Sequence, residues 1–478
     1  MPIYKTPGVY IEEISTLPPS IAPVETAIPA FIGYTERATK DGDDSALILV
    51  PTRITSLLEY LEIFGRLRPE TMTASITDQL DASGQVQTRT IDAALDPSSP
   101  SGYLMYYALD MFFRNGGGPC YIVSIGSYSN PIDANDFIGV PGTVGGLEAA
   151  ATVDEPTLLV FPDAISLGTV SLYGSVASAA LSQCNELQDR FTILDVYDNG
   201  TSSAIADFRN AVSSDYLNYG AAYYPQLKTT LSYGYDAGGV TVSHEVISAN
   251  GTSNPGSFDG DSLATVGLTN PSLTRSIIAK LRELYVTLPP SALMAGVYAR
   301  VDSDRGVWKA PANVSLNSVI QPTVRVTNDL QDRLNVDATS GKSINAIRTF
   351  AGRGILVWGA RTLAGNDNEW RYVPVRRLFI FVEESVKKAS EFVVFEPNDA
   401  KTWVRVEAMI ENFLTSLRRE GALAGAKPED ALFVNVGLGQ TMTAEDILNG
   451  IMNVEIGMAA VRPAEFIILK FSHKLQTS

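Results

Sequence analysis

Both ends of this chain carry a strand-like segment that has no partner in the neighbouring sequence. Residues 8–14 form a short strand candidate, and the prolines around it keep the chain extended and exclude helix. Residues 466–471 read FIILKF, in which Ile467, Leu469 and Phe471 share one face. No turn signal offers the first segment a hairpin partner. Because an unpaired apolar strand is an aggregation hazard, we expect both ends to pair with something outside the local sequence.

An unpaired strand of this kind can complete a sheet in another copy of the same chain. If both ends do so, each copy is tied to several neighbours and the product is an extended array. A contact between different surfaces that does not close on itself generates a helix or a tube. The chain ends therefore favour a polymer-forming structural protein.

The middle of the chain alternates between strand and helix patterns. Strands are predicted at 157–161, 191–196 and 220–224, and helices at 164–185 and near 203–212. Strands that alternate with helices in this order are typical of a mainly parallel sheet. The fold class predicted is therefore mixed α/β.

The flanking regions are less regular. Residues 66–100 are polar and predict a surface insertion or mobile loop, and residues 229–270 predict short strands. Further on, the pattern predicts a strand at 354–359 and helices at 378–392 and 404–417.

The charge of the chain argues against nucleic acid as its main ligand. The 478 residues include 36 basic and 53 acidic side chains, which give a net charge of −17. Most of this charge falls on residues 131–270, which hold 3 basic and 16 acidic residues. An acidic middle segment that faces solvent is the simplest interpretation.

The sequence offers no catalytic constellation and no metal-ligand spacing. Its two histidines, His244 and His473, stand alone and are expected to be exposed. No cofactor motif is present, and we predict no catalytic, cofactor-binding or metal-binding residues. The enzyme alternative rests on Asp163 and Asp195, which follow two predicted strands and would need a ligand pocket beside them.

Two cysteines, Cys120 and Cys184, are too few for a disulfide framework in a chain of this length. They are expected to be small buried apolar residues. The N-terminus shows no pattern of a signal peptide, which favours synthesis in a reducing cytoplasm.

A set of motifs along the chain resembles the contractile tail sheath family. The set covers nearly the whole chain in the family's order. The motifs are TPGVYIEE at 6–13, FIG at 31–33, NGG at 115–117, CYIV at 120–123, GVWKAPAN at 306–313, INAIR at 344–348, GRGILVWGARTL at 352–363, YVPVRRL at 372–378, FEPN at 395–398 and PAEF at 463–466.

The resemblance implies that the two chain ends are arms that lend strands to a sheet in neighbouring subunits. The matching positions for this exchange are Val9, Tyr10, Ile11, Glu12, Ile14, Phe466, Ile467, Ile468, Leu469, Lys470 and Phe471. It also implies a discontinuous sheath core, completed by the exchanged strands, with an inserted α/β outer domain. The expected division is an N-terminal arm at 1–30, the core at 31–130 and 300–460, the acidic outer domain at 131–299 and a C-terminal arm at 461–478.

By the same resemblance, the subunits stack as helically offset hexameric rings around an inner tube, and the sheath contracts to drive the tube into a target cell. The partners implied are further copies of the chain, the tube protein, and baseplate and terminator proteins, with neither nucleic acid nor membrane insertion. The particle is a phage tail or a tail-like injection device assembled in bacteria. Basic residues on C-terminal helices are expected to face an acidic tube; these are Lys387, Lys388, Arg418 and Arg419. The alternatives are another tail, baseplate or shell component and, as a different class, an α/β enzyme.

Overall fold

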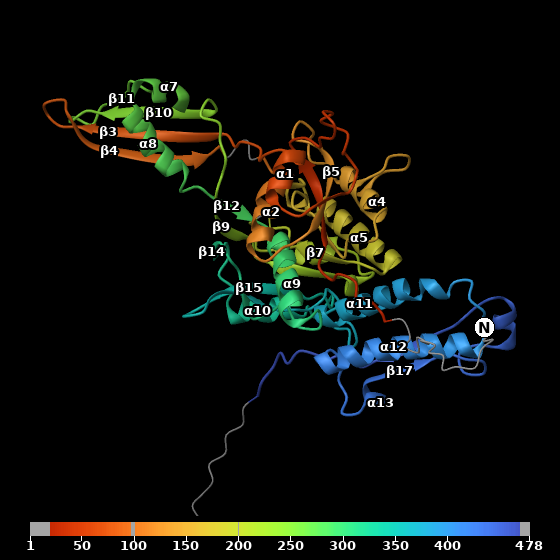
Figure 1. Cartoon of the computed structure of the whole chain (residues 1–478). Coiled ribbons are helices and arrows are strands. Elements are labelled where there is room, and N and C mark those ends of the chain that lie inside the picture. Colours follow the sequence, from red (N-terminus) through yellow and green to blue (C-terminus); the bar gives the residue numbers. More distant parts are fainter. Residues whose placement is uncertain (1–19, 97–100, 199, 469–478) are drawn as a thin grey trace, which may run out of the picture. The chain divides into compact units, whose positions relative to one another are not determined.

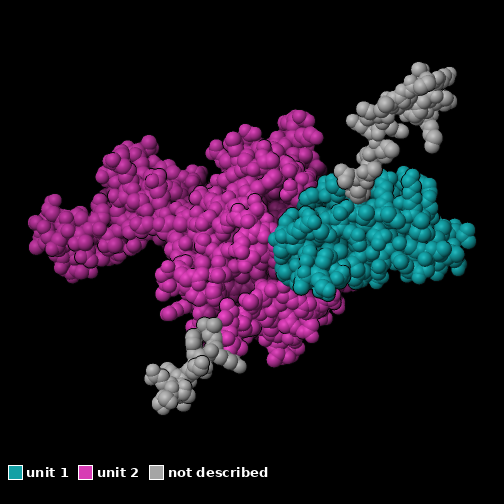
Figure 2. Space-filling view, turned by 60° about the horizontal axis from the view of Figure 1, so that its bottom comes forward, with its two compact units in different colours: residues 1–24, 381–461 teal, residues 25–380, 462–478 magenta. Residues whose placement is uncertain are grey.

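The computed structural model describes residues 20–96, 101–198 and 200–468. The chain forms two compact units, coloured separately in Figure 2. Unit 1 consists of residues 1–24 and 381–461, and unit 2 of residues 25–380 and 462–478.

Unit 2 is built on a nine-stranded sheet. Its six central strands, β15, β8, β7, β6, β1 and β5, are parallel, and antiparallel strands extend both edges (Figure 1). From edge to edge the strands are β13 (Val314–Ser315), β16 (Gly354–Trp358), β15 (Ile344–Phe350), β8 (Gly220–Tyr224), β7 (Phe191–Asp195), β6 (Leu158–Val160), β1 (Pro29–Thr35), β5 (Cys120–Ser127) and β2 (Thr52–Ile54). The parallel sheet predicted for the middle of the chain is confirmed.

Helices cover both faces of this sheet, which explains why every residue of β1 is buried. On β1, Phe31 packs against Phe112 of α2, with 5.1 Å between ring centroids. Its neighbour Ile32 points the other way, toward Gly146 of α4. One layer holds α2 (Met105–Arg114) and α9 (Ser291–Arg305). The other holds α3 (Ala134–Ile138), α4 (Gly146–Ala151), α5 (Val170–Leu187) and α6 (Ala204–Ala211).

The sheet takes strands from three of the ranges predicted as domains, namely 31–130, 131–299 and 300–460. Cys120 on β5 and Cys184 on α5 are both free thiols buried in its core, as predicted. Burial raises the pKa of both thiols. The division into a core and an inserted domain stays a prediction for the assembled particle.

The close approach of α5 to α6 leaves no room for a side chain at Gly174. A Cβ on Gly174 of α5 would lie 2.4 Å from the carbonyl oxygen of Ala211 at the end of α6. Gly174→Ala is therefore expected to lower the free energy of unfolding by about 1–3 kcal/mol. The matched control is Gly267→Ala in α7 (Leu263–Thr269), where the nearest side chain is 3.9 Å away. There the usual helix preference should raise stability by about 0.5–1 kcal/mol. Urea denaturation of both variants measures the difference, and equal effects would contradict the argument.

A second sheet in unit 2 has a core of its own, and we call it the β lobe (residues 70–96 and 234–284). Its strand order is β11 (Ser253–Pro255), β10 (Val240–Ile247), β3 (Met72–Leu80) and β4 (Val86–Leu95), and α7 and α8 (Pro271–Leu281) pack against it (Figure 1). Of the two alternatives predicted for 66–100, a surface insertion or a mobile loop, the mobile loop is wrong over these strands. Met72, Ala74 and Ile76 alternate inward along β3, and their burial against the helices holds the hairpin in place.

The β lobe also shows that the prediction of an exposed His244 is wrong. His244 on β10 is only 4% exposed, and its Nε2 lies 3.1 Å from Asp78 on β3. Arg89 on β4 donates to the same carboxylate and holds the pKa of Asp78 below its ordinary value. The buried ring therefore has a charged partner, which compensates for its loss of water. His473 lies outside the described residues.

Smaller elements complete unit 2. A three-stranded sheet joins β12 (Tyr285–Leu288), β9 (Leu227–Ser232) and β14 (Val319–Pro322). The remaining helices are α1 (Leu57–Phe64) and α10 (Asn328–Asn335), with short 3₁₀ turns at Ala164–Ser166 and Leu217–Tyr219.

Unit 1 contains two long helices and a two-stranded sheet. The helix α11 (Val373–Ser390) begins in unit 2 and continues into unit 1, where Phe381 packs on Phe413 of α12 (Ala400–Glu420). The Asp399 side chain accepts from the Thr402 N–H, which explains why α12 begins four residues before the predicted start. The other elements are a 3₁₀ turn at Glu391–Val393, α13 (Pro428–Ala431), β17 (Leu432–Asn435), α14 (Ala444–Leu448) and β18 (Glu455–Met458).

Candidate assembly site

The C-terminal segment leaves unit 2 exposed and unpaired within the described chain. Phe466, Ile467 and Ile468 are 74%, 77% and 79% exposed, and none of them is in a strand. Three adjacent apolar side chains in water are costly unless another surface covers them. Of the other residues predicted for strand exchange, Val9, Tyr10, Ile11, Glu12, Ile14, Leu469, Lys470 and Phe471 lie outside the described residues.

The two-stranded sheet of unit 1 is bordered only by a single bridge, between Leu423 and Ala460 just beyond β18, among the described residues. β17 and β18 pair in antiparallel fashion, and no third strand joins them in the part of the chain that the structure describes. Leu432 and Val434 are buried toward the unit, whereas Phe433 is 48% exposed. An isolated pair of strands is marginally stable, and its outer edges carry N–H and C=O groups that can accept further strands.

The four basic residues predicted to face a tube do not form one patch. Lys387 and Lys388 lie in the last turn of α11, and both pair with Glu384, at 3.1 Å and 3.3 Å. Arg418 and Arg419 lie in the last turn of α12, about 30 Å of helix from its start. Arg418 is half-buried and donates to the carbonyl of Ala426, whereas Arg419 is exposed.

The two aspartates of the enzyme alternative hold helices in place. The Asp163 carboxylate accepts from the backbone N–H groups of Leu104 and Met105, at the start of α2. The Asp195 carboxylate accepts from the N–H and the hydroxyl of Ser291, the first residue of α9. Burial raises the pKa of each carboxyl to about 7. Both residues therefore cap the two helices of one layer, a structural use of a buried acid.

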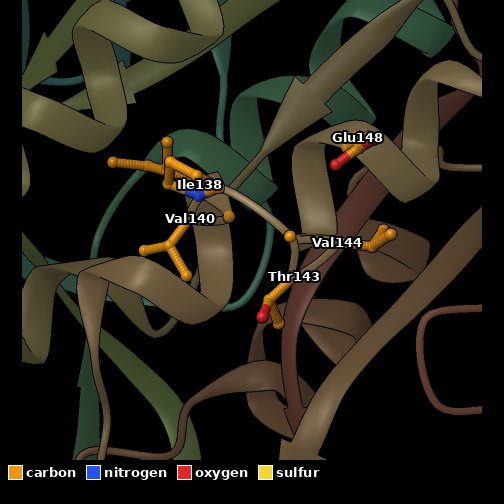
Figure 3. A pocket seen from close by; sticks show the side chains of 8 residues that line it. Ile138, Val140, Thr143, Val144 and Glu148 are labelled. Atoms are coloured by element: carbon orange, nitrogen blue, oxygen red, sulfur yellow. The ribbon is translucent and has the colours of Figure 1, made fainter.

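One hollow of unit 2 offers no group of catalytic side chains. It has a volume of about 520 Å³ and is formed by the loop from Ile138 to Val144 (Figure 3). Glu148 is the only charged side chain that lines it, and neither Asp163 nor Asp195 does. The described residues include no group of three or more His, Cys, Asp or Glu side chains that could hold a metal ion. Among the same residues, no helix is both long and apolar enough to cross a membrane.

The raised pKa of Asp195 predicts a change of stability with pH. An aspartate in an unfolded chain titrates near pH 4, so the folded protein binds this proton more tightly. The stabilisation is complete below pH 4 and is lost as the pH rises through about 7. The unfolding free energy of the wild type minus that of Asp195→Asn should therefore fall by about 2–4 kcal/mol between pH 5 and pH 8. Urea denaturation of both proteins at the two pH values measures it, and a constant difference would contradict the assignment.

Two family models match most of the chain. The model of the phage tail sheath protein central domain matches residues 139–363, and that of the phage tail sheath C-terminal domain matches residues 365–474. Curated relatives match over shorter stretches. The tail sheath protein of Vibrio phage KVP40 is 28% identical over 28% of this chain and 20% of its own length. That of Burkholderia phage BcepMu is 30% identical over 29% of this chain and 30% of its own. The matched part of this chain thus spans less than a third of either relative.

Solved structures match from end to end. The contracted sheath of an extracellular contractile injection system, PVC, is 31% identical, with a TM-score of 0.64 over 99% of both chains. The contracted helical sheath of the anti-feeding prophage is 34% identical, with a TM-score of 0.63 over 99% of this chain and 100% of the other. The two family models follow one another along residues 139–474, and the solved structures match over 99% of the chain at more than 30% identity. The chain therefore belongs to the contractile tail sheath family.

Proposed function

We propose that this chain is the subunit of a contractile sheath that polymerises around an inner tube and drives the tube into a target cell. The observation that carries the proposal is the end-to-end likeness, at 31–34% identity, to chains of two contracted sheaths. Its role is structural, and we propose no enzymatic activity. The particle is a phage tail or a tail-like injection device.

Assembly proceeds through stacked, helically offset rings of six subunits. A similar chain, 34% identical over 99% of this one, comes from a baseplate described as six-fold symmetrised, which supports this symmetry. The partners proposed are further copies of the chain, the tube protein, and baseplate and terminator proteins. The tube contact is proposed at Lys387 and Lys388 or at Arg418 and Arg419, since the two pairs lie in different helix ends.

The terminal arms connect the subunits. The exposed apolar segment 466–468 and the residues after it extend the open edge of β17 or β18 in one neighbour, and the N-terminal arm does the same in another. Backbone hydrogen bonds hold these strands, so the links persist while surfaces between whole subunits are exchanged. Contraction is then a rigid-body rearrangement in which new contacts of the contracted state provide the work.

Electron microscopy of the purified protein, with and without its tube protein, tests the proposal. We expect helical tubes in the presence of the tube protein, and short, wide contracted tubes or rings in its absence. Closed shells or discs in both samples would favour the alternative of another baseplate or shell component. That alternative has some support, because two similar solved structures are of baseplates.

A further inference from the structure

A buried ion pair holds the chain near the end of the predicted N-terminal arm, three residues before β1 begins. The Arg377 guanidinium on α11 donates to both oxygens of the Asp302 carboxylate on α9, at 3.0 Å and 2.5 Å, and the two side chains are 3% and 6% exposed. Thr26 joins the pair, because its hydroxyl donates to Asp302 at 2.7 Å and its carbonyl accepts from Arg377 at 2.8 Å. The backbone at residue 26 is thus fixed to two helices of unit 2.

The other end of the chain is held in the same way. The Glu465 carboxylate accepts from Nε of Arg361 at 2.9 Å and 3.1 Å, and from the Tyr372 hydroxyl at 3.2 Å. Arg361 is 6% exposed and Glu465 raises its pKa, mainly through these hydrogen bonds. The next residue, Phe466, is 74% exposed. Ala464 and Glu465 are already exposed, so the Glu465 carboxylate fixes an exposed stretch of chain to a buried arginine.

One member of each ion pair is tied to the nine-stranded sheet. The Arg361 N–H donates to the side chain of Asn345 on β15 at 2.8 Å, and its carbonyl accepts from the same side chain at 2.7 Å. Asp302 lies on α9, which packs against β6 and β7. Two-point Arg–carboxylate pairs fix direction as well as distance, and Arg361 makes such a pair through Nε and Nη2. Burial of both partners protects the Arg377–Asp302 pair from screening.

We infer that the Arg361–Glu465 and Arg377–Asp302–Thr26 contacts are anchors that hold the roots of the two terminal arms on unit 2. A pull on an arm is passed into the large sheet and does not peel the chain off its own subunit. The inference rests on the proposed function for its load, whereas the anchoring itself is a property of the single subunit.

Spin labelling of the isolated full-length subunit tests the anchoring. Because Cys120 and Cys184 are buried, a label at Phe466→Cys reacts selectively. Glu465→Gln removes the ion pair with little change of shape and should make the label tumble about threefold faster or more. Arg361→Lys keeps the charge, loses the two-point geometry and should act in the same direction. The matched control, Glu369→Gln, removes an exposed carboxylate of the same unit and should leave the spectrum unchanged.

For the N-terminal root, a label at Glu25→Cys should respond in the same way to Thr26→Val. Unchanged label motion in Glu465→Gln and Arg361→Lys would overturn the anchors and leave the sheath assignment untouched. Sheaths assembled from the Glu465→Gln chain should break into shorter pieces on contraction. Intact contracted sheaths would show that the Arg361–Glu465 contact does not carry load. If truncation of the arms leaves assembly normal, the proposed exchange fails even where the labels respond as expected.

Discussion

A chain in which Ile467 and Ile468 are both replaced by proline is expected to remain a folded subunit and to form no tubes. Proline has no backbone N–H, and neighbouring residues of a strand point their N–H groups to opposite sides. The double substitution therefore removes a hydrogen-bond donor whichever edge of the strand pairs with a neighbour. Both side chains are more than three-quarters exposed in the subunit, so its own core loses nothing. Electron microscopy scores the assembly, and circular dichroism checks the fold.

The control is Ile467→Val with Ile468→Val, which keeps the donors and the β-branched shape and should assemble normally. A truncation after Phe466 is a second version of the experiment. It removes the predicted strand but keeps Glu465 on Arg361, so no buried arginine loses its partner. Deletion of residues 1–15 should also abolish assembly. Normal tubes from the double-proline chain and from both deletions would refute the strand exchange.

The βα units of unit 2 could be predicted from the sequence because their signals are local. The strands β6, β7 and β8 each bury a continuous run of residues, and the helices α5 and α6 each bury one face at helical spacing. One stretch of sequence is therefore enough to predict each of them. The β lobe carries a weaker local signal. Met72, Ala74 and Ile76 alternate with Thr and Ser along β3, but its parallel pairing with β10, about 170 residues away, is not visible in either stretch of sequence.

The charged contacts could not be predicted either, because their partners are far apart in the sequence. His244 is buried because Asp78 lies beside it, 166 residues away along the chain. Arg361 and Glu465 are 104 residues apart, and each belongs to a motif that the sequence analysis singled out only for its resemblance. No periodicity links such pairs. At the chain ends the limit is different, because the sequence indicates strands whose expected partners belong to other copies of the protein.

Removing one member of the Arg377–Asp302 pair should produce the largest loss of stability of any single substitution considered for this chain. Asp302→Ala leaves a guanidinium that is 3% exposed without its carboxylate. Among the described residues, the Thr26 carbonyl and the face of the Tyr298 ring, 4.6 Å away, remain beside it. A buried charge deprived of its partner costs about 3–5 kcal/mol.

Replacing both members, with Asp302→Leu and Arg377→Met, removes the two charges together and should restore most of that loss. Urea denaturation followed by tryptophan fluorescence measures all three proteins. The matched control is Glu283→Ala, which breaks the exposed pair with Lys280 and should cost less than about 1 kcal/mol. If Asp302→Ala costs no more than this control, water or a rearranged side chain compensates Arg377. In that case the contact could not resist a pull on the N-terminal arm. A contact whose removal does not lower the stability of the subunit contributes no free energy that could hold the chain against a force.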